Sequence, residues 1–102
     1  AVKYMSEVGK REEKSNRPDI FKVNTYINLA VIIPDRKIGK EYAIKSYKVY
    51  MNNKEQFRNS MGFINTVSIL SEFYVAEKNY SEAERVIMSG YEYAKVNYQK
   101  NI

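Results

Sequence analysis

The alternation of small and large side chains between residues 69 and 94 constrains the fold of this chain more than any other feature. Ser71 in one predicted helix and Ala83 in the next allow two helix backbones to approach closely, and Gly90 does the same one or two turns later. Larger side chains stand at helical spacing around the small ones, where they would fill the space beside the contact. They are Leu70, Tyr74, Tyr80 and Ile87. This spacing predicts two helices packed against each other as a hairpin.

The same pattern recurs earlier in the chain with a period of 40 to 42 residues. The small residue of the second helix is repeated as Ala1, Ala43 and Ala83. The bulky position after it holds Met5, Tyr47 and Ile87, and the next position of the pattern holds Val8, Tyr50 and Gly90. The first-helix pair Leu70 and Ser71 has its counterpart at Leu29 and Ala30, which Tyr26 precedes. We therefore expect two complete hairpins, preceded by the second helix of an earlier one.

This pattern resembles the tetratricopeptide repeat, a helix-turn-helix unit of about 34 residues. The resemblance implies an all-α fold of antiparallel hairpins stacked as an α-solenoid segment, with longer helices and connections than the standard unit. It divides the chain into residues 1–16 (the second helix of a partial repeat and a polar linker), 17–51 (the first hairpin) and 52–102 (the second hairpin). Because the chain lacks an initiator Met and begins inside an apparent repeat, we expect a fragment of a longer array.

Local helix signals agree with an all-α fold. The Pro-Asp pair at positions 18 and 19 marks the start of a helix, which Pro34 ends because proline disfavours the helical region for the residue before it. Residues 35–39 are predicted as a turn, and Ser81 with Glu84 has the spacing of a capping box. No segment alternates with the period of a strand. The predicted helices span residues 1–9, 19–33, 40–51, 54–78 and 81–98.

The residue types that most catalysis requires are missing from this sequence. It contains no His and no Cys, which removes the commonest general base, the thiol nucleophile and the usual transition-metal ligands. Carboxylate pairs occur at Glu12 and Glu13 and at Glu82 and Glu84, and we interpret them as solvated surface charges beside Lys and Arg. No glycine-rich phosphate-binding motif is present. We expect neither an enzyme nor a cofactor or metal site.

The positive charge is concentrated in the first half of the chain. The net charge is +5, and residues 1–50 carry eleven Lys or Arg against six Asp or Glu, whereas residues 51–102 carry six of each. The basic residues around the first hairpin's turn and second helix could meet nucleic-acid phosphates as a stripe, so a nucleic-acid-associated helical domain is the alternative function. These residues are Arg36, Lys37, Lys40, Lys45 and Lys48. The same spacing is typical of a solvated helix face, which is the interpretation we favour.

Membrane insertion and secretion are not expected. The longest apolar run, Leu29–Ile33, stops at Pro34 and is far shorter than the ~18 residues that a membrane span requires. No secretory signal is visible, so we expect a cytoplasmic rather than a secreted protein. The frequent use of Lys, Asn, Ile and Tyr favours an AT-rich bacterial source.

The family resemblance also implies a binding groove lined by the first helix of each hairpin. The groove positions correspond to Asn24, Ile27, Asn28 and Val31 in the first hairpin and to Asn65, Ser68, Ile69 and Glu72 in the second. An Asn side chain carries both a donor and an acceptor, so it can satisfy the backbone of an extended peptide. The family's carboxylate clamp is not matched, because Ile27 and Val31, then Ser68 and Glu72, stand where the clamp has Lys and Asn.

The expected function is that of a protein- or peptide-binding repeat module, acting as a scaffold or as the sensor part of a regulator. Such a module binds through Asn24, Asn28, Val31, Asn65, Ser68 and Glu72, with no cofactor. We expect Lys40, Lys45 and Lys48 on the opposite, convex side. We also expect self-association through open apolar ends at Met5, Val8, Tyr91 and Ala94.

Overall fold

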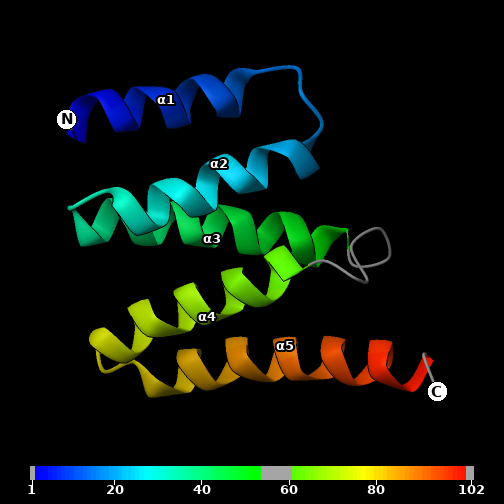
Figure 1. Ribbon diagram of the computed structural model, residues 1–102. Helices are drawn as coiled ribbons and strands as arrows, with labels where there is room; N and C mark the ends of the chain where they lie inside the picture. The colour runs from blue at the N-terminus through cyan, green and yellow to red at the C-terminus, as the bar shows by residue number, and fades with distance from the viewer. Residues whose placement is uncertain (1, 54–60, 101–102) are drawn as a thin grey trace.

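Five helices make up the part of the chain that the structure describes (Figure 1). The computed structural model describes the backbone of residues 2–53 and 61–100 and the side chains of residues 7–18, 21–53 and 61–92. The prediction of an all-α fold is confirmed for these residues, and none of their helices is long and apolar enough to cross a membrane. The helices are α1 (Val2–Lys14), α2 (Asp19–Ile32), α3 (Arg36–Asn52), α4 (Met61–Ala76) and α5 (Tyr80–Lys100).

Each helix runs opposite to the next, and the closest pairs are α2 with α3 and α4 with α5. Helices α2 and α4 run in the same direction and also contact each other. The molecule is flat, with extents of 46 × 36 × 17 Å. Because packed helix axes lie about 8–10 Å apart, its shortest dimension accommodates roughly two helices. Helices α2 and α3, and then α4 and α5, thus form two successive antiparallel pairs.

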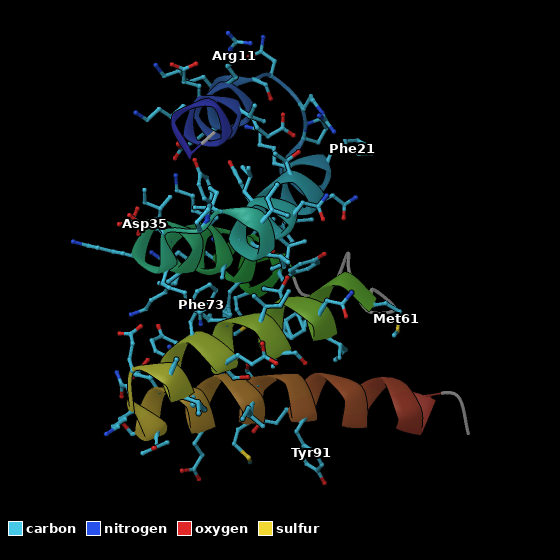
Figure 2. All side chains as sticks on the ribbon, turned by 60° about the vertical axis from the view of Figure 1, so that its left-hand side comes forward. Arg11, Phe21, Asp35, Met61, Phe73 and Tyr91 are labelled. Atoms are coloured by element: carbon cyan, nitrogen blue, oxygen red, sulfur yellow. The ribbon has the colours of Figure 1, made fainter. Side chains whose placement is uncertain are left out.

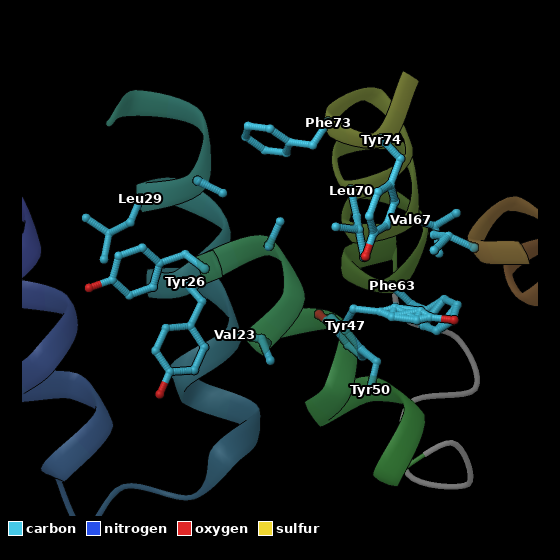
Figure 3. Close-up of a cluster of buried hydrophobic side chains, with 14 of the residues drawn as sticks. Val23, Tyr26, Leu29, Tyr47, Tyr50, Phe63, Val67, Leu70, Phe73 and Tyr74 are labelled. Atoms are coloured by element: carbon cyan, nitrogen blue, oxygen red, sulfur yellow. The ribbon is translucent and has the colours of Figure 1, made fainter. Parts of the chain in front are cut away.

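The hydrophobic core continues from the first helix pair into the second (Figure 3). The buried ring of Phe63 on α4 packs against two tyrosine rings of α3, with centroids 6.3 Å from Tyr47 and 5.5 Å from Tyr50. Between the same helices, the hydroxyls of Ser46 and Thr66 form a buried hydrogen bond of 2.8 Å. Because α3 and α4 share apolar and polar contacts, the two pairs form one packed unit.

The small residues predicted at the close helix contacts are buried. Ala43 and Ala83 are both in the core. A Cβ atom on Gly90 would lie 3.0 Å from Cγ1 of Val67, so α5 approaches α4 more closely than most side chains would permit. The other predicted core positions that are buried are Tyr26, Leu29, Ala30, Tyr47, Leu70, Ser71 and Tyr74.

Two predicted core residues, Tyr80 and Ile87, are instead 61% and 49% exposed. The stripe of α5 that faces α4 runs through Ala83, Val86 and Gly90, and Val86 is 0% exposed. Because successive residues of a helix are 100° apart, burying Val86 turns Ile87 away from α4. Tyr80 is the first residue of α5, level with the end of α4, so little of α4 extends far enough to cover its ring.

Two helix boundaries differ from the prediction by four residues or more, and the other described ones by two at most. Helix α1 continues to Lys14, through part of the predicted polar linker. Helix α3 begins at Arg36, because the carboxylate of Asp35 accepts hydrogen bonds from the amides of Lys37 (3.0 Å) and Ile38 (3.2 Å). The prediction of a turn through residue 39 is therefore wrong. The predicted helical residues 54–60 lie outside the described residues.

The turn between α4 and α5 is closed by two backbone hydrogen bonds around Lys78. The amide of Lys78 donates to the carbonyl of Val75 at 2.9 Å, and that of Asn79 donates to Tyr74 at 2.8 Å. This is the Schellman arrangement, and it places Lys78 in the left-handed region with a φ of 61°. Ser81 lies inside α5, and its hydroxyl donates to the Asn79 side chain at 3.4 Å. The predicted capping box is therefore wrong.

Helix α1 packs on the first helix pair through a glycine and two carboxylates. Gly9 lies against the ring of Tyr42, where a side chain would overlap with the phenol. The carboxylate of Glu13 pairs with Lys45 of α3 at 2.9 Å. Glu12 is buried and pairs with Arg17 at 3.0 Å, so its interpretation as a solvated charge is wrong. This carboxylate instead ties α1 to the connection that leads into α2.

The residues expected on open apolar ends have different surroundings. Tyr91 is 60% exposed and points away from the other helices (Figure 2), whereas Val8 is half-buried. Ala1 lies outside the described residues, and so do the side chains of Met5 and Ala94. Self-association through an open apolar end therefore remains a prediction, and it applies to the outward face of α5 alone.

Candidate peptide-binding surface

The six residues predicted to bind a peptide all have exposed side chains. They form an α2 stripe of Asn24, Asn28 and Val31 and an α4 stripe of Asn65, Ser68 and Glu72. Within each stripe the residues are three or four positions apart, which places them on one face of the helix. Each helix thus presents a straight row of mainly polar side chains to solvent.

A hollow of about 170 Å³ joins the two stripes (the smaller hollow). Val31 of the α2 stripe and Glu72 of the α4 stripe both line it, together with Ile69 of α4. The other residues of each stripe lie on the same helix face as Val31 or Glu72. Because α2 and α4 run in the same direction, we expect both stripes to face the side of the molecule on which the hollow lies. The residues of the two stripes that do not line the hollow are Asn24, Asn28, Asn65 and Ser68.

A larger hollow of about 500 Å³ adjoins the smaller one and shares Arg36 and Phe73 with it. Its other charged lining residues are Lys37, Lys40 and Glu77. The Lys40 ammonium lies 2.8 Å from the Glu77 carboxylate, so the charges of these two residues compensate each other. Within the described part of the chain, Arg36 and Lys37 have no ion-pair partner. The larger hollow therefore has an excess of positive charge.

The hollows form where the ends of α2, α3 and α4 meet at Gly39. A Cβ atom there would lie 3.0 Å from the Ala30 carbonyl oxygen of α2 and 3.2 Å from Cζ of Phe73 of α4. Figure 2 shows the Phe73 side chain in the space between α4 and α3. The guanidinium carbon of Arg36 lies 4.7 Å from the centroid of the Phe73 ring. The close approach at Gly39 thus holds the first turn of α3, with its basic residues, against α4.

Sequence reasoning considered Arg36 and Lys37 only as part of a basic group that could meet nucleic acid, and it did not place them beside the peptide-binding surface because it assigned both to a turn. The signal was present, since Asp35 follows Pro34 in the same order as the Pro-Asp pair that correctly marked the start of α2. An Asp at this position caps the free amides of a first helical turn. Recognising the cap would have placed both basic residues on the first turn of α3, but it would not have predicted the approach of that turn to α4.

The three lysines expected on the convex side do not form one stripe. Lys40 lines the larger hollow beside the candidate surface, so its predicted placement on the opposite side is wrong. Lys45 faces α1, where it pairs with Glu13 at 2.9 Å, and Lys48 is exposed. Two of the three lysines pair with carboxylates of other segments, Lys40 with Glu77 in the turn after α4 and Lys45 with Glu13 of α1, so the lysines do not act as one basic stripe.

The groups on this surface suit hydrogen bonding and apolar contact. The carboxylate of Glu72 and the guanidinium of Arg36 share the smaller hollow with Val31 and Ile69, and the exposed amides and hydroxyl lie further along the two stripes. In the described residues no three His, Cys, Asp or Glu side chains gather where they could hold a metal ion. The shifted pKa values belong to residues elsewhere: burial raises the pKa of Tyr42, and a hydrogen bond from Arg85 to Glu82 raises the pKa of Arg85.

Comparison with known proteins adds no assignment to this surface. No protein-family model matches the chain, and neither curated proteins nor solved structures gave a match.

Proposed function

We propose that this chain is a tetratricopeptide-like repeat module that binds an extended segment of another protein through the α2 and α4 stripes and catalyses no reaction. The observation that carries the proposal is the smaller hollow, which Val31, Ile69 and Glu72 line together. A hollow that combines apolar and polar lining residues, with exposed hydrogen-bonding side chains along the same helices, can hold one side chain of a peptide while polar groups bind its backbone. A scaffold or the sensor part of a regulator needs such a surface and no catalytic groups.

The correspondence between the two helix pairs supports the repeat assignment. Leu29 on α2 and Leu70 on α4 are both buried, and each is followed by a buried small residue. The small residues of the second helices, Ala43 and Ala83, are buried too. Two helix pairs that bury the same positions in the same order are expected of a repeat whose units stack on their neighbours.

Selection from a random peptide library displayed on phage tests the proposed binding, with the immobilised chain as target. Selected peptides are then labelled, and their Kd is measured by fluorescence anisotropy with the unchanged chain and with an Asn28→Ala/Asn65→Ala variant. We expect binding to weaken by about 1–3 kcal/mol for each buried hydrogen-bonding partner that is lost. The thermal melt should hardly change, because both side chains are exposed.

Asn16→Ala is the matched control, since Asn16 is also exposed but lies in the connection between α1 and α2. Val31→Asp tests the hollow itself by placing a charge where an apolar side chain should bind. Peptides that bind both the double variant and Val31→Asp as tightly as the unchanged chain would contradict the proposal.

The nucleic-acid alternative is tested by its response to salt. Phosphate binding should weaken steeply as salt is added, whereas binding of a neutral peptide should change little. The ion pairs of Lys40 with Glu77 and of Lys45 with Glu13 speak against this alternative, because they leave those lysines without excess charge. We therefore favour the peptide.

We also propose that the outward face of α5 mediates self-association with a second copy of the chain. Ile87, Met88 and Tyr91 are exposed within little more than one turn of the helix, and no helix of the described chain covers them. Contiguous exposed apolar surface tends to find a partner. Sedimentation should show association of the unchanged chain with rising concentration and a monomer for Ile87→Lys/Tyr91→Lys. An unchanged chain that remains monomeric at high concentration would contradict this assignment.

A further inference from the structure

The larger hollow brings positive charge next to the smaller hollow, whose lining includes the aliphatic side chains of Val31 and Ile69, and this juxtaposition narrows the class of ligand. We propose that the bound segment is acidic, with a carboxylate at Arg36 and Lys37 and a neighbouring aliphatic side chain between Val31 and Ile69. This inference rests on the proposed function of the α2 and α4 stripes. It adds residues from α3 to the surface and specifies the chemistry of the ligand.

The charge balance of the larger hollow favours an anion. Its lining contains three basic side chains and one acidic side chain, and the acidic one is engaged by Lys40 at 2.8 Å. Two positive charges, on Arg36 and Lys37, therefore remain without a carboxylate partner among the described residues. A carboxylate entering this hollow would meet both of them and could accept charge-assisted hydrogen bonds from each.

The position of Arg36 suits it to this task. Its guanidinium lies over the face of Phe73, a contact that holds the group while leaving its N–H edge available. A guanidinium edge matches the two oxygens of a carboxylate. Because Arg36 lines both hollows, a carboxylate bound to it lies next to whatever fills the smaller one.

Glu72 sets the order of the two ligand groups. It lines the smaller hollow with Val31, Ile69 and Arg36, so a carboxylate placed there would meet a like charge beside the guanidinium, whereas Lys40 already compensates the one acidic residue of the larger hollow. An aliphatic side chain meets no such penalty and removes apolar surface from water. The acid is therefore favoured in the larger hollow and the aliphatic residue in the smaller one, next to each other along the segment.

The test uses peptides selected on the full chain, each paired with a copy in which Asp is replaced by Asn and Glu by Gln. We expect the unchanged chain to bind the acidic peptide about 10-fold or more tightly than its amide copy. Arg36→Gln should remove most of this preference, and Lys37→Ala should reduce it. Lys48→Ala is the matched control, because it removes the same charge from an exposed site of α3 outside both hollows and should preserve the preference.

The outcomes separate this inference from the proposed function. Peptides that require Asn28 and Asn65 but bind equally well as acids and as amides would overturn the acidic ligand alone. Failure to select any peptide would overturn both. A single-stranded dT oligonucleotide that binds as tightly as the acidic peptide, and depends on Arg36 and Lys37, would replace the peptide with a nucleic acid. Equal effects of Arg36→Gln and Lys48→Ala would show general charge attraction and overturn the assigned site.

Discussion

The two helix pairs share a packing pattern but differ in what covers their outer sides. Ala43 of α3 and Ala83 of α5 occupy corresponding positions, and both are buried on helices that contact the first helix of their own pair. The preceding residue is a buried Tyr42 in the first pair and a partly exposed Glu82 in the second. The inner contact of each pair is thus the same, while the outer contact depends on the neighbouring helix.

The bulky position one turn later shows the difference most clearly. Tyr47 is 6% exposed because Phe63 of α4 covers it, whereas the corresponding Ile87 is 49% exposed. The charged residues follow the same rule. Lys45 pairs with Glu13 of the neighbouring α1, but the corresponding Arg85 pairs with a residue of its own helix. The surroundings of a repeat position therefore depend on its neighbours as well as on the repeat itself.

The largest expected difference between the pairs comes from truncating their corresponding bulky residues. Tyr47→Ala should lower the free energy of unfolding by about 3–5 kcal/mol, as other buried aromatic truncations do. It removes the ring from Phe63 and the hydrogen bond that the Tyr47 hydroxyl donates to Ser89 at 2.8 Å. Ile87→Ala should cost less than about 1.5 kcal/mol, because half of that side chain is already exposed.

Urea denaturation of both variants measures this difference, and Tyr47→Phe serves as the control. That variant keeps the ring and should lose only about 1 kcal/mol for the hydrogen bond. Similar losses for Tyr47→Ala and Ile87→Ala would show that the two pairs are covered alike, contrary to the structure.

Enlarging a small residue tests how closely the two helices of the second pair approach each other. Ala83→Leu should lower the free energy of unfolding by about 1–3 kcal/mol through overpacking between α4 and α5. Met88→Leu, a change of similar volume on the exposed face of the same helix, should be nearly neutral. A melt that Ala83→Leu leaves unchanged would count against the close contact and the repeat assignment.

The features that could be predicted from the sequence depend on contacts within one helix pair. The small positions Ala43, Ala83 and Gly90 were predicted correctly, because a hairpin of two helices determines where they meet. Ile87 was predicted wrongly, since choosing between positions 86 and 87 as the buried one requires the direction from which α4 approaches. The start of α3 was predicted wrongly for a different reason. The sequence shows Asp35 as a possible cap, but the prediction did not take it as the start of the helix.

The candidate surface likewise combines features that depend on a single helix with others that depend on several segments. Helical spacing alone was enough to place each predicted residue on an exposed stripe of its helix. The contribution of Arg36 could not be predicted in this way, because it depends on three helix ends meeting at Gly39. Contacts among three separate segments leave no periodic trace in the sequence.

Alkaline pH provides a further contrast, between Tyr42 and its counterpart Glu82. Burial raises the pKa of Tyr42 above 10.0, with Lys45 opposing the shift and Glu13 and Glu41 adding to it. A raised folded-state pKa contributes stability that is present below the unfolded-state pKa and is lost as pH rises through the folded one. Unfolding measured from about pH 9 to about pH 11 should therefore show a smaller loss for Tyr42→Phe than for the unchanged chain. Equal losses would mean that the phenol titrates as freely as an exposed one.

The smallest expected effect on stability concerns the turn within each pair, because the two turns are stabilised in different ways. The first pair caps the start of its second helix with Asp35, whereas the second pair ends its first helix with Lys78 at a φ of 61°. A side chain with a Cβ atom is disfavoured in this left-handed region, and glycine is not. Lys78→Gly should therefore raise the free energy of unfolding by about 0.5–1 kcal/mol, net of the greater freedom of glycine in the unfolded chain. Lys78→Ala is the control, because it removes the charge and keeps the Cβ atom. If thermal melts show the alanine variant to be as stable as the glycine variant, the left-handed turn at Lys78 is not the source of the gain.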